Sequence, residues 1–140
     1  MAAAPTLHVR ADTAELGRVR RRARAWAAEA GLDEAATRRL VLAVDETVAN
    51  AIEHGLGPGA RVVVRAETAP QRLTVAVRYR GERFDPTTAP TPSAADALRA
   101  RAAHGYGLHL IRSLADAVAY RWDDGTNEVR LTMTRETTAR

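Results

Sequence analysis

The sequence predicts an α+β fold, a two-layer α/β sandwich whose mixed, mostly antiparallel sheet has helices on one face. Two segments that alternate apolar and polar residues, 61–79 and 118–134, predict hairpins. Two longer segments, 12–30 and 33–55, carry apolar residues three and four positions apart and predict helices. Because strands and helices of this kind bury one side each, the helices are expected to cover a single face of the sheet.

The length of 140 residues predicts a single domain, which we place at residues 6–135, followed by a frayed tail at 136–140. The absence of cysteine excludes disulfides and cysteine-ligated zinc. No apolar run approaches the ~20 residues that cross a bilayer. Residues 1–5 lack the pattern of a signal peptide, so a cytoplasmic protein with no membrane partner is expected.

The formal net charge is +4, and all 21 basic residues are arginine. Without lysine, the chain cannot form a Walker-type phosphate loop. A basic chain can bind nucleic acid or an acidic protein. The six aromatic residues are not interleaved with the arginines, which argues against base stacking and against direct nucleic-acid binding.

The first strand is expected at Thr6–Ala11, followed by a helix that Asp12 or Thr13 caps and Gly31 ends. One face of this helix is apolar. The other face carries a run of arginines: Arg18, Arg20, Arg21, Arg22 and Arg24. Such a run is typical of a solvated helix face, and it is also what a docking surface for an acidic partner requires.

The second helix is expected from about Asp33 to Gly55, with a buried apolar stripe. A polar ridge follows at helical spacing: Glu46, Asn50, Glu53 and His54. A carboxylate and an amide one turn apart suit an oxygen-ligated magnesium site, or a general base beside one. The alternative is a solvated helix face with no chemical role.

Strands are expected at Arg61–Thr68 and Arg72–Tyr79, joined by a short turn. A second turn at residues 81–86 leads into the proline- and threonine-rich segment 87–92. A short helical piece is expected from Ser93 to about Ala103. A long irregular segment in a small domain is typical of a lid or a binding loop.

Gly105 and Gly107 open directly onto an apolar helix that extends to about Asp116. Glycines let a backbone approach a ligand closely, and a helix start presents N–H groups to phosphate. The alternative is an ordinary glycine turn before a packed helix. Strands at Val118–Trp122 and Val129–Thr134, joined by a turn at 123–126, are expected to close the fold.

Over residues 7–134 the chain resembles a known family. It is similar to the anti-sigma regulatory factors of the serine/threonine-kinase type, small members of the GHKL ATPases with the Bergerat, or histidine-kinase-like, fold. The segment Asp45–Gly55 matches the N-box of that family, and Gly105–Leu108 matches its second glycine box. Residues 110–116 continue as the family does.

The resemblance implies a bacterial regulator of transcription that uses ATP and Mg²⁺ as cofactors. Glu46 would be the general base, and Asn50 would hold the magnesium. The residues implied to bind the nucleotide come from the N-box and from both glycine boxes: Asn50, Gly81, Gly105, Tyr106, Gly107 and Leu108. The implied partners are a sigma factor, an anti-anti-sigma protein of the STAS type, and a second copy of the chain.

The first glycine box departs from the family pattern. Gly81 and Phe84-Asp85-Pro86 are in register, but Tyr79 stands where the family has the aspartate that accepts a hydrogen bond from adenine. A tyrosine is neutral and bulkier than that carboxylate. Losing a charge-assisted contact would cost about 1.5 to 3 kcal/mol of binding free energy.

The sequence therefore leaves two main hypotheses for the function and a weaker third one. The first is a protein-serine kinase that phosphorylates an anti-anti-sigma partner and sequesters a sigma factor. The second is a binding module of the same fold that regulates by docking, with weak or no nucleotide binding, and Tyr79 favours it. A third, weaker hypothesis is the ATP-binding part of a sensor histidine kinase, which would have to act in trans because the sequence shows no phosphoacceptor helix.

Overall fold

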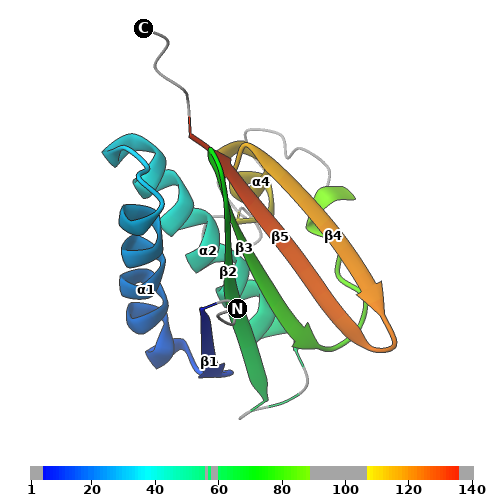
Figure 1. Ribbon diagram of the computed structural model, residues 1–140. Coiled ribbons are helices and arrows are strands. Elements are labelled where there is room, and N and C mark those ends of the chain that lie inside the picture. Colours follow the sequence, from blue (N-terminus) through cyan, green and yellow to red (C-terminus); the bar gives the residue numbers. More distant parts are fainter. Residues whose placement is uncertain (1–4, 56, 58–59, 89–106, 136–140) are drawn as a thin grey trace, which may run out of the picture.

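The computed structural model describes residues 5–55, 57, 60–88 and 107–135, with the backbone alone at 88 and 107–110. Helices lie on one side of a twisted sheet, so the molecule has two layers (Figure 1). The elements run in the order β1 (Thr6–Arg10), α1 (Leu16–Glu29), α2 (Glu34–His54), β2 (Arg61–Ala69), β3 (Arg72–Arg80), α4 (Gly107–Leu114), β4 (Ala117–Asp123) and β5 (Thr126–Thr134). Two short 3-10 helices, Thr13–Glu15 and Pro86–Thr88, add to these. The predicted α+β class is confirmed.

The five strands form one sheet in the order β1-β2-β3-β5-β4. All four pairings among the described strands are antiparallel. Strands β2 and β3, and strands β4 and β5, are the two predicted hairpins. Because β5 inserts between β3 and β4, the last strand of the chain lies next to the middle of the sheet, and β4 forms an edge.

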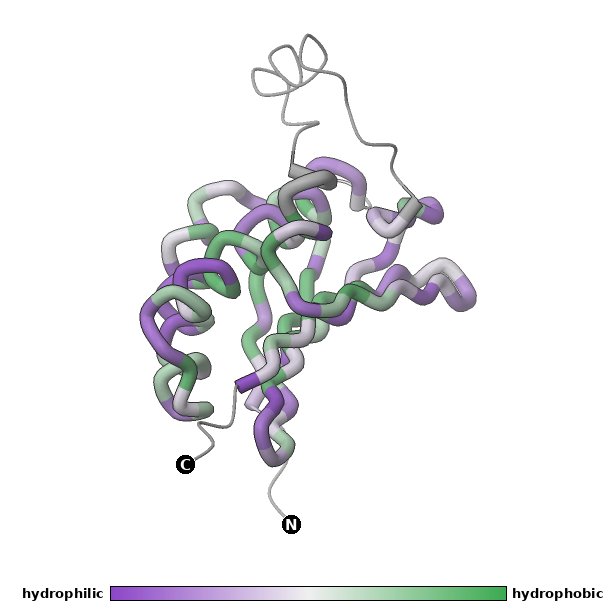
Figure 2. Tube along the Cα trace, turned by 90° about the horizontal axis from the view of Figure 1, so that it is seen from above, coloured by the Kyte–Doolittle hydropathy of each residue, from purple (hydrophilic) through white to green (hydrophobic). Residues whose placement is uncertain are grey.

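Side chains alternate strictly between the two faces of the central strands. In β3, Leu73, Val75, Val77 and Tyr79 point toward the helices and are at most 4% exposed. The arginines at both ends of the same strand are exposed. Hydrophobic stretches gather where helices and strands face each other (Figure 2). Burial of this single apolar layer is the main force that holds the two layers together.

The caps of the first two helices follow local chemistry. Asp12 accepts a hydrogen bond from the Ala14 N–H at 2.9 Å, so the 3-10 turn Thr13–Glu15 precedes α1. Asp33 accepts one from the Ala36 N–H at 2.7 Å and begins α2 as predicted. The predicted buried stripe of α2 is also observed, since Leu40, Val44, Thr47, Val48 and Ala51 are at most 1% exposed.

Strand β5 begins three residues earlier than predicted, at Thr126 instead of Val129. The reason is the tight turn: Asp124 and Gly125 both have positive φ, of 51° and 81°. A two-residue turn of this kind matches the twist of the flanking strands, so pairing resumes at once between Asp123 and Thr126. Helix α4 is shorter than predicted and contains Gly107 as its first residue. The predicted helical piece at 93–103 lies outside the described residues.

Candidate functional site

The polar ridge of α2 is not uniformly solvated. Asn50 is only 6% exposed, and its Nδ2 group has no hydrogen-bond partner among the described residues. Glu46, one turn earlier, is partly buried, whereas Glu53 and His54 are exposed. A buried amide without a partner costs about 1 to 3 kcal/mol of stability, so its presence in a packed helix points to a use other than folding.

Asn50 lines a small cavity between α2, β3 and the start of the 3-10 turn at Pro86. The cavity has a volume of about 10 Å³ and is lined by Thr47, Asn50, Tyr79, Phe84, Pro86, Ile111 and Val129. That volume admits about one water molecule. Small-molecule sites usually measure ~300 Å³ or more, so this cavity by itself is not a site of nucleotide size.

Tyr79 fills the space beside Asn50. It is 4% exposed and points to the helix-covered side of the sheet, in register with Asn127 of β5. Burial, with a smaller contribution from Tyr120, raises the pKa of the Tyr79 hydroxyl well above its ordinary value. The side chain is therefore neutral, and it supplies none of the negative charge of the aspartate that it replaces.

Gly81 lies against the end of α2. Gly55 and Gly81 form an isolated antiparallel bridge. A Cβ atom on Gly81 would come within 2.9 Å of the His54 carbonyl oxygen, and one on Gly55 within 2.6 Å of the Ala51 carbonyl oxygen. Both contacts are with backbone, which cannot move aside easily. Gly81 therefore joins β3 to α2, and its predicted contact with a nucleotide stays a prediction.

A buried asparagine holds the turn that follows Gly81. Asn127 is fully buried, and its Nδ2 group donates to the Glu82 carbonyl at 2.9 Å. Its Oδ1 accepts from the Phe84 N–H at 3.1 Å and from the Tyr120 hydroxyl. The Phe84 N–H also lies 3.0 Å from the Tyr120 oxygen. This network fixes the Phe84 backbone at the mouth of the cavity.

The Phe84 ring stacks on His54, with ring centroids 4.0 Å apart and an angle of 22° between the planes. His54 is exposed and does not line the cavity, but this stacking places it next to the turn after β3. Sequence reasoning missed Tyr120, whose only signal was its helix-facing position in the alternation of β4. It also could not show that Phe84 would meet His54, because they lie thirty residues apart and meet only through the Gly55–Gly81 bridge.

Of the second glycine box, Gly105 and Tyr106 lie outside the described residues. Gly107 and Leu108 begin α4, where the backbone alone is described. Helix α4 packs along α2, and its Ile111 is fully buried and lines the cavity beside Asn50. The structure thus brings the start of α4 to the same end of α2 as Glu46 and Asn50. That arrangement presents helix N–H groups on this side of the molecule.

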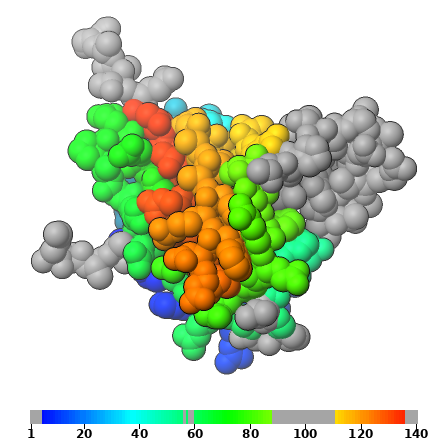
Figure 3. Space-filling view, turned by 90° about the vertical axis from the view of Figure 1, so that its right-hand side faces the viewer, coloured from blue at the N-terminus to red at the C-terminus, as the bar shows by residue number. Residues whose placement is uncertain are grey.

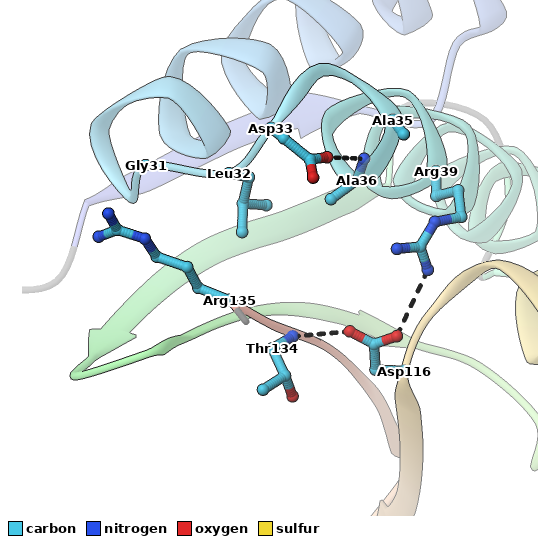
Figure 4. Close-up of a pocket in the computed structure, with 9 residues that line it drawn as sticks. All are labelled: Gly31, Leu32, Asp33, Ala35, Ala36, Arg39, Asp116, Thr134 and Arg135. Atoms are coloured by element: carbon cyan, nitrogen blue, oxygen red, sulfur yellow. Dashed lines mark hydrogen bonds and ion pairs between the residues drawn. The ribbon is translucent and has the colours of Figure 1, made fainter. Parts of the chain in front are cut away.

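A wider hollow, of about 610 Å³, lies at the opposite end of α2 (Figure 4). Its charged groups already serve the fold. Asp116 accepts a hydrogen bond from the Thr134 N–H at 2.7 Å and lies 3.3 Å from Arg39, while Asp33 caps α2. These pairs join α4, β5 and α2, so we do not assign this hollow to catalysis.

The arginine run of α1 is largely paired. Arg18 contacts Glu15 at 2.8 Å, Arg20 contacts Asp45 at 2.8 Å, and Arg24 contacts Glu34 at 3.3 Å. The pairs of Arg20 and Arg24 link α1 to α2. Exposed pairs of this kind contribute little stability, but they occupy the charges that a docking surface would need. This pattern favours the solvated-face interpretation for most of the run.

Within the described ranges, no three histidine, cysteine, aspartate or glutamate side chains are grouped as a metal-binding cluster. A magnesium site on Asn50 would instead depend on amide and phosphate oxygens. None of the helices in the described part of the chain has the length and apolar character needed to span a membrane.

Residues 9–133 match the family described as the histidine kinase-like ATPase domain. The chain is 32% identical over 95 residues to the serine/threonine-protein kinase BtrW of Bordetella bronchiseptica, which covers 66% of this chain and 67% of that protein. A solved structure with the RsbU and RsbW domains of a Mycobacterium tuberculosis protein is similar, with a TM-score of 0.67 and 26% identity. That match covers 99% of this chain and 35% of the other, so this chain spans about a third of that length.

The histidine kinase AdeS of Acinetobacter baumannii is also similar, with a TM-score of 0.50 and 12% identity over 97% of this chain and 70% of the other. At that identity the likeness shows the fold alone. Together the matches confirm the predicted fold and family.

Proposed function

Because the chain belongs to the histidine kinase-like ATPase domain family, we propose that it is an anti-sigma regulatory factor. In this proposal it binds ATP with Mg²⁺, phosphorylates a serine on an anti-anti-sigma protein, and sequesters a sigma factor. The similarity to BtrW, which is named a serine/threonine-protein kinase, supports the kinase activity. The similarity to the structure with an RsbW domain supports the regulatory role. They do not identify the sigma factor or the phosphorylated partner.

The observation that carries the proposal is the unpartnered Nδ2 group of the buried Asn50. The unpaired Nδ2 group is a donor that can bind an acceptor oxygen of a ligand such as a phosphate. The Oδ1 atom of the same side chain, not the Nδ2 group, would hold the magnesium. Asn50 and Glu46 are one turn apart on α2, and Ile111 of α4 lies on the same cavity as Asn50. The phosphate and metal end of the site therefore fits the proposed chemistry.

The proposed phosphoryl transfer requires the protein mainly to position the reacting groups. Bound magnesium would neutralise charge on the phosphates, and Asn50 would hold it. Glu46 would accept the proton of the partner's serine hydroxyl as that oxygen bonds to the γ-phosphorus. The bond between the γ-phosphorus and its bridging oxygen would break, and ADP would leave. The N–H groups at the start of α4 would face the phosphates.

The adenine end does not fit in the same way. Tyr79 is buried at the position where the family has its adenine-binding aspartate, and the cavity beside it holds about 10 Å³. The second candidate function is therefore a module of the same fold that regulates by docking, without nucleotide. The burial of Tyr79 is the observation that favours it.

Calorimetric titration of ATP, with and without magnesium, tests the proposal. Three variants accompany the parent protein: Asn50→Ala, Tyr79→Asp, and Glu53→Ala as the matched control on an exposed turn of the same helix. We expect micromolar binding that requires magnesium, at least about tenfold weaker binding in Asn50→Ala, and no change in Glu53→Ala. Thermal unfolding shows that each variant is folded.

If the parent protein binds no ATP and Tyr79→Asp does, the pocket is intact but lacks its adenine contact. The kinase proposal then fails, and docking alone remains. If the parent binds, the next assay is transfer of labelled phosphate to a candidate anti-anti-sigma protein. A Glu46→Gln variant that transfers phosphate at the parent rate would remove Glu46 from its proposed role.

A further inference from the structure

The face of the sheet that none of the described helices covers is strongly basic. Strand register and alternation place eight arginines on it: Arg10, Arg61, Arg65, Arg72, Arg78, Arg80, Arg121 and Arg130. The acidic residues at equivalent positions are Glu67, Asp123 and Glu128. In Figure 3 the strands lie side by side at the surface on this side of the molecule.

The acidic residues compensate only one part of this face. Glu67 pairs with Arg130 at 2.5 Å, and Glu128 lies 3.8 Å from Arg78 and 3.6 Å from Arg121. All these contacts involve the side of the sheet near β5. Five exposed arginines form no ion pair in the part of the chain that the structure describes: Arg10, Arg61, Arg65, Arg72 and Arg80. Arg65 nevertheless lies close enough to Glu67 to help lower the pKa of that carboxyl. Four of these five belong to β1, β2 and the end of β3 beside α2.

A hollow of about 520 Å³ lies beside three of these arginines, Arg61, Arg65 and Arg80, and beside Arg78. The other residues that line it are Ala60, Val63, Tyr79 and Thr126, of which Ala60 and Val63 are partly buried. A second hollow, of about 500 Å³, adjoins it at β1 and shares Arg61. The floor is apolar and the rim is positive. A hollow with apolar residues between positive ones can accept an apolar side chain from a segment that also carries acidic residues.

We propose that this face, from β1 to β3, docks an acidic segment of a partner protein, with an apolar side chain of that segment inserted beside Val63. Arginine forks bind carboxylates through two parallel hydrogen bonds and are common in protein interfaces. The inference does not rest on the proposed phosphoryl transfer, because Asn50 and Glu46 lie on the helix side of the sheet.

Two other occupants fit less well. Tyr79 borders the hollow, but its strand position faces the helices and it is only 4% exposed. Tyr120 and Trp122 also occupy positions that face the helices, so the described part of the open face offers no exposed aromatic side chain for stacking on bases. A second copy of the chain, placed with the same region against this one, would bring unpaired arginines together, which like-charge repulsion opposes.

The probe is a short fluorescent peptide in which glutamates flank a central leucine, titrated by anisotropy at low and high salt. One control peptide has lysines in place of the glutamates, and another has serine in place of the leucine. The test variant is Arg61→Ala with Arg80→Ala. The matched control is Arg21→Ala with Arg22→Ala, which removes the same charge from exposed positions of α1.

We expect the acidic peptide to bind, the lysine peptide not to bind, and affinity to fall with salt. The Arg61/Arg80 variant should bind at least about tenfold more weakly, whereas the Arg21/Arg22 variant should stay within about twofold of the parent. Val63→Ser should reduce the parent's preference for the leucine peptide over the serine peptide. All these positions are at least partly exposed, so thermal unfolding should show folded variants.

Equal losses of peptide affinity in the two double variants would show that binding depends only on net charge, and this result would overturn the proposal. Tighter binding of duplex DNA or of phosphatidylserine vesicles than of the acidic peptide, lost in the Arg61/Arg80 variant, would assign the face to a different occupant. Sedimentation that shows a dimer in the parent and a monomer in the same variant would assign it to a second copy.

Discussion

The two faces of the sheet differ in what their residues do, although they alternate along the same strands. On the helix side, residues such as Leu131 and Val75 are fully buried, and Asn50 from α2 is the polar group left without a partner. On the open side, arginines project from the alternate positions of β2 and β3. The helix side holds the small cavity beside Asn50. The open side has charge in excess, and none of the described helices covers it.

This difference separates two kinds of function. A closed polar site suits chemistry or binding of a small molecule, because exclusion of water strengthens each contact. An exposed basic face suits recognition of another macromolecule, where long-range attraction speeds encounter. The same strands can serve both functions, because alternate residues of a strand point to opposite faces of the sheet.

The largest effect should separate two neighbours in β5. Leu131→Ala removes a fully buried side chain on the helix side and should cost about 2 to 5 kcal/mol of unfolding free energy. Arg130→Ala, on the open side, should cost no more than about 1 kcal/mol, because its ion pair with Glu67 is partly exposed. Urea unfolding followed by tryptophan fluorescence measures both. Equal losses would show that the open side is as tightly packed as the helix side.

The close approach of β3 to α2 should give the next effect. Gly81→Ala places a Cβ 2.9 Å from the His54 carbonyl oxygen and should cost about 1 to 3 kcal/mol. The control is Gly17→Ala in α1, where the nearest atom is the flexible end of Arg21 at 3.5 Å. That change should be neutral or stabilise by up to about 1 kcal/mol. A Gly81→Ala protein as stable as its parent would mean that the bridge to Gly55 can open without cost.

The helix side should also respond to alkali. Burial raises the pKa of Tyr79 above its ordinary value, so above about pH 10 the unfolded chain loses this proton while the folded chain keeps it. Stability should therefore fall as pH rises, by at most about 1.4 kcal/mol for each pH unit from this group. Tyr79→Phe should flatten that slope. An unchanged slope in the variant would show that Tyr79 ionises as easily in the folded protein as in the unfolded one.

The smallest effect is expected on the open side, in acid. Hydrogen bonding to Arg130 lowers the pKa of Glu67, so its contribution to stability is present above the ordinary pKa and is lost as pH falls through the lowered value. Glu67→Gln should cost less than about 1 kcal/mol at neutral pH, and the difference from the parent should shrink below about pH 4. A difference that persists in acid would trace the effect to packing instead of charge.

Local patterns were sufficient for most of the fold. Neighbouring residues predict the helical spacing of α2, its cap at Asp33 and its end at Gly55. They also predict the alternation in β2 and β3. The start of β5 was misplaced because the two positive φ angles of Asp124 and Gly125 allow pairing to resume sooner than the apolar pattern suggests. The domain limits and the roles of the site residues stay predictions.

The sequence by itself determined the family, the two-layer class and the position of Glu46 and Asn50 on one helix ridge, because each depends on spacing along the chain. Only the tertiary structure decided that Asn50 is buried without a partner, that Tyr79 closes the space beside it, and that Phe84 stacks on His54. It also decided that arginines from separate strands meet on one uncovered face. These facts depend on strand order and on contacts between distant residues, which no local pattern encodes.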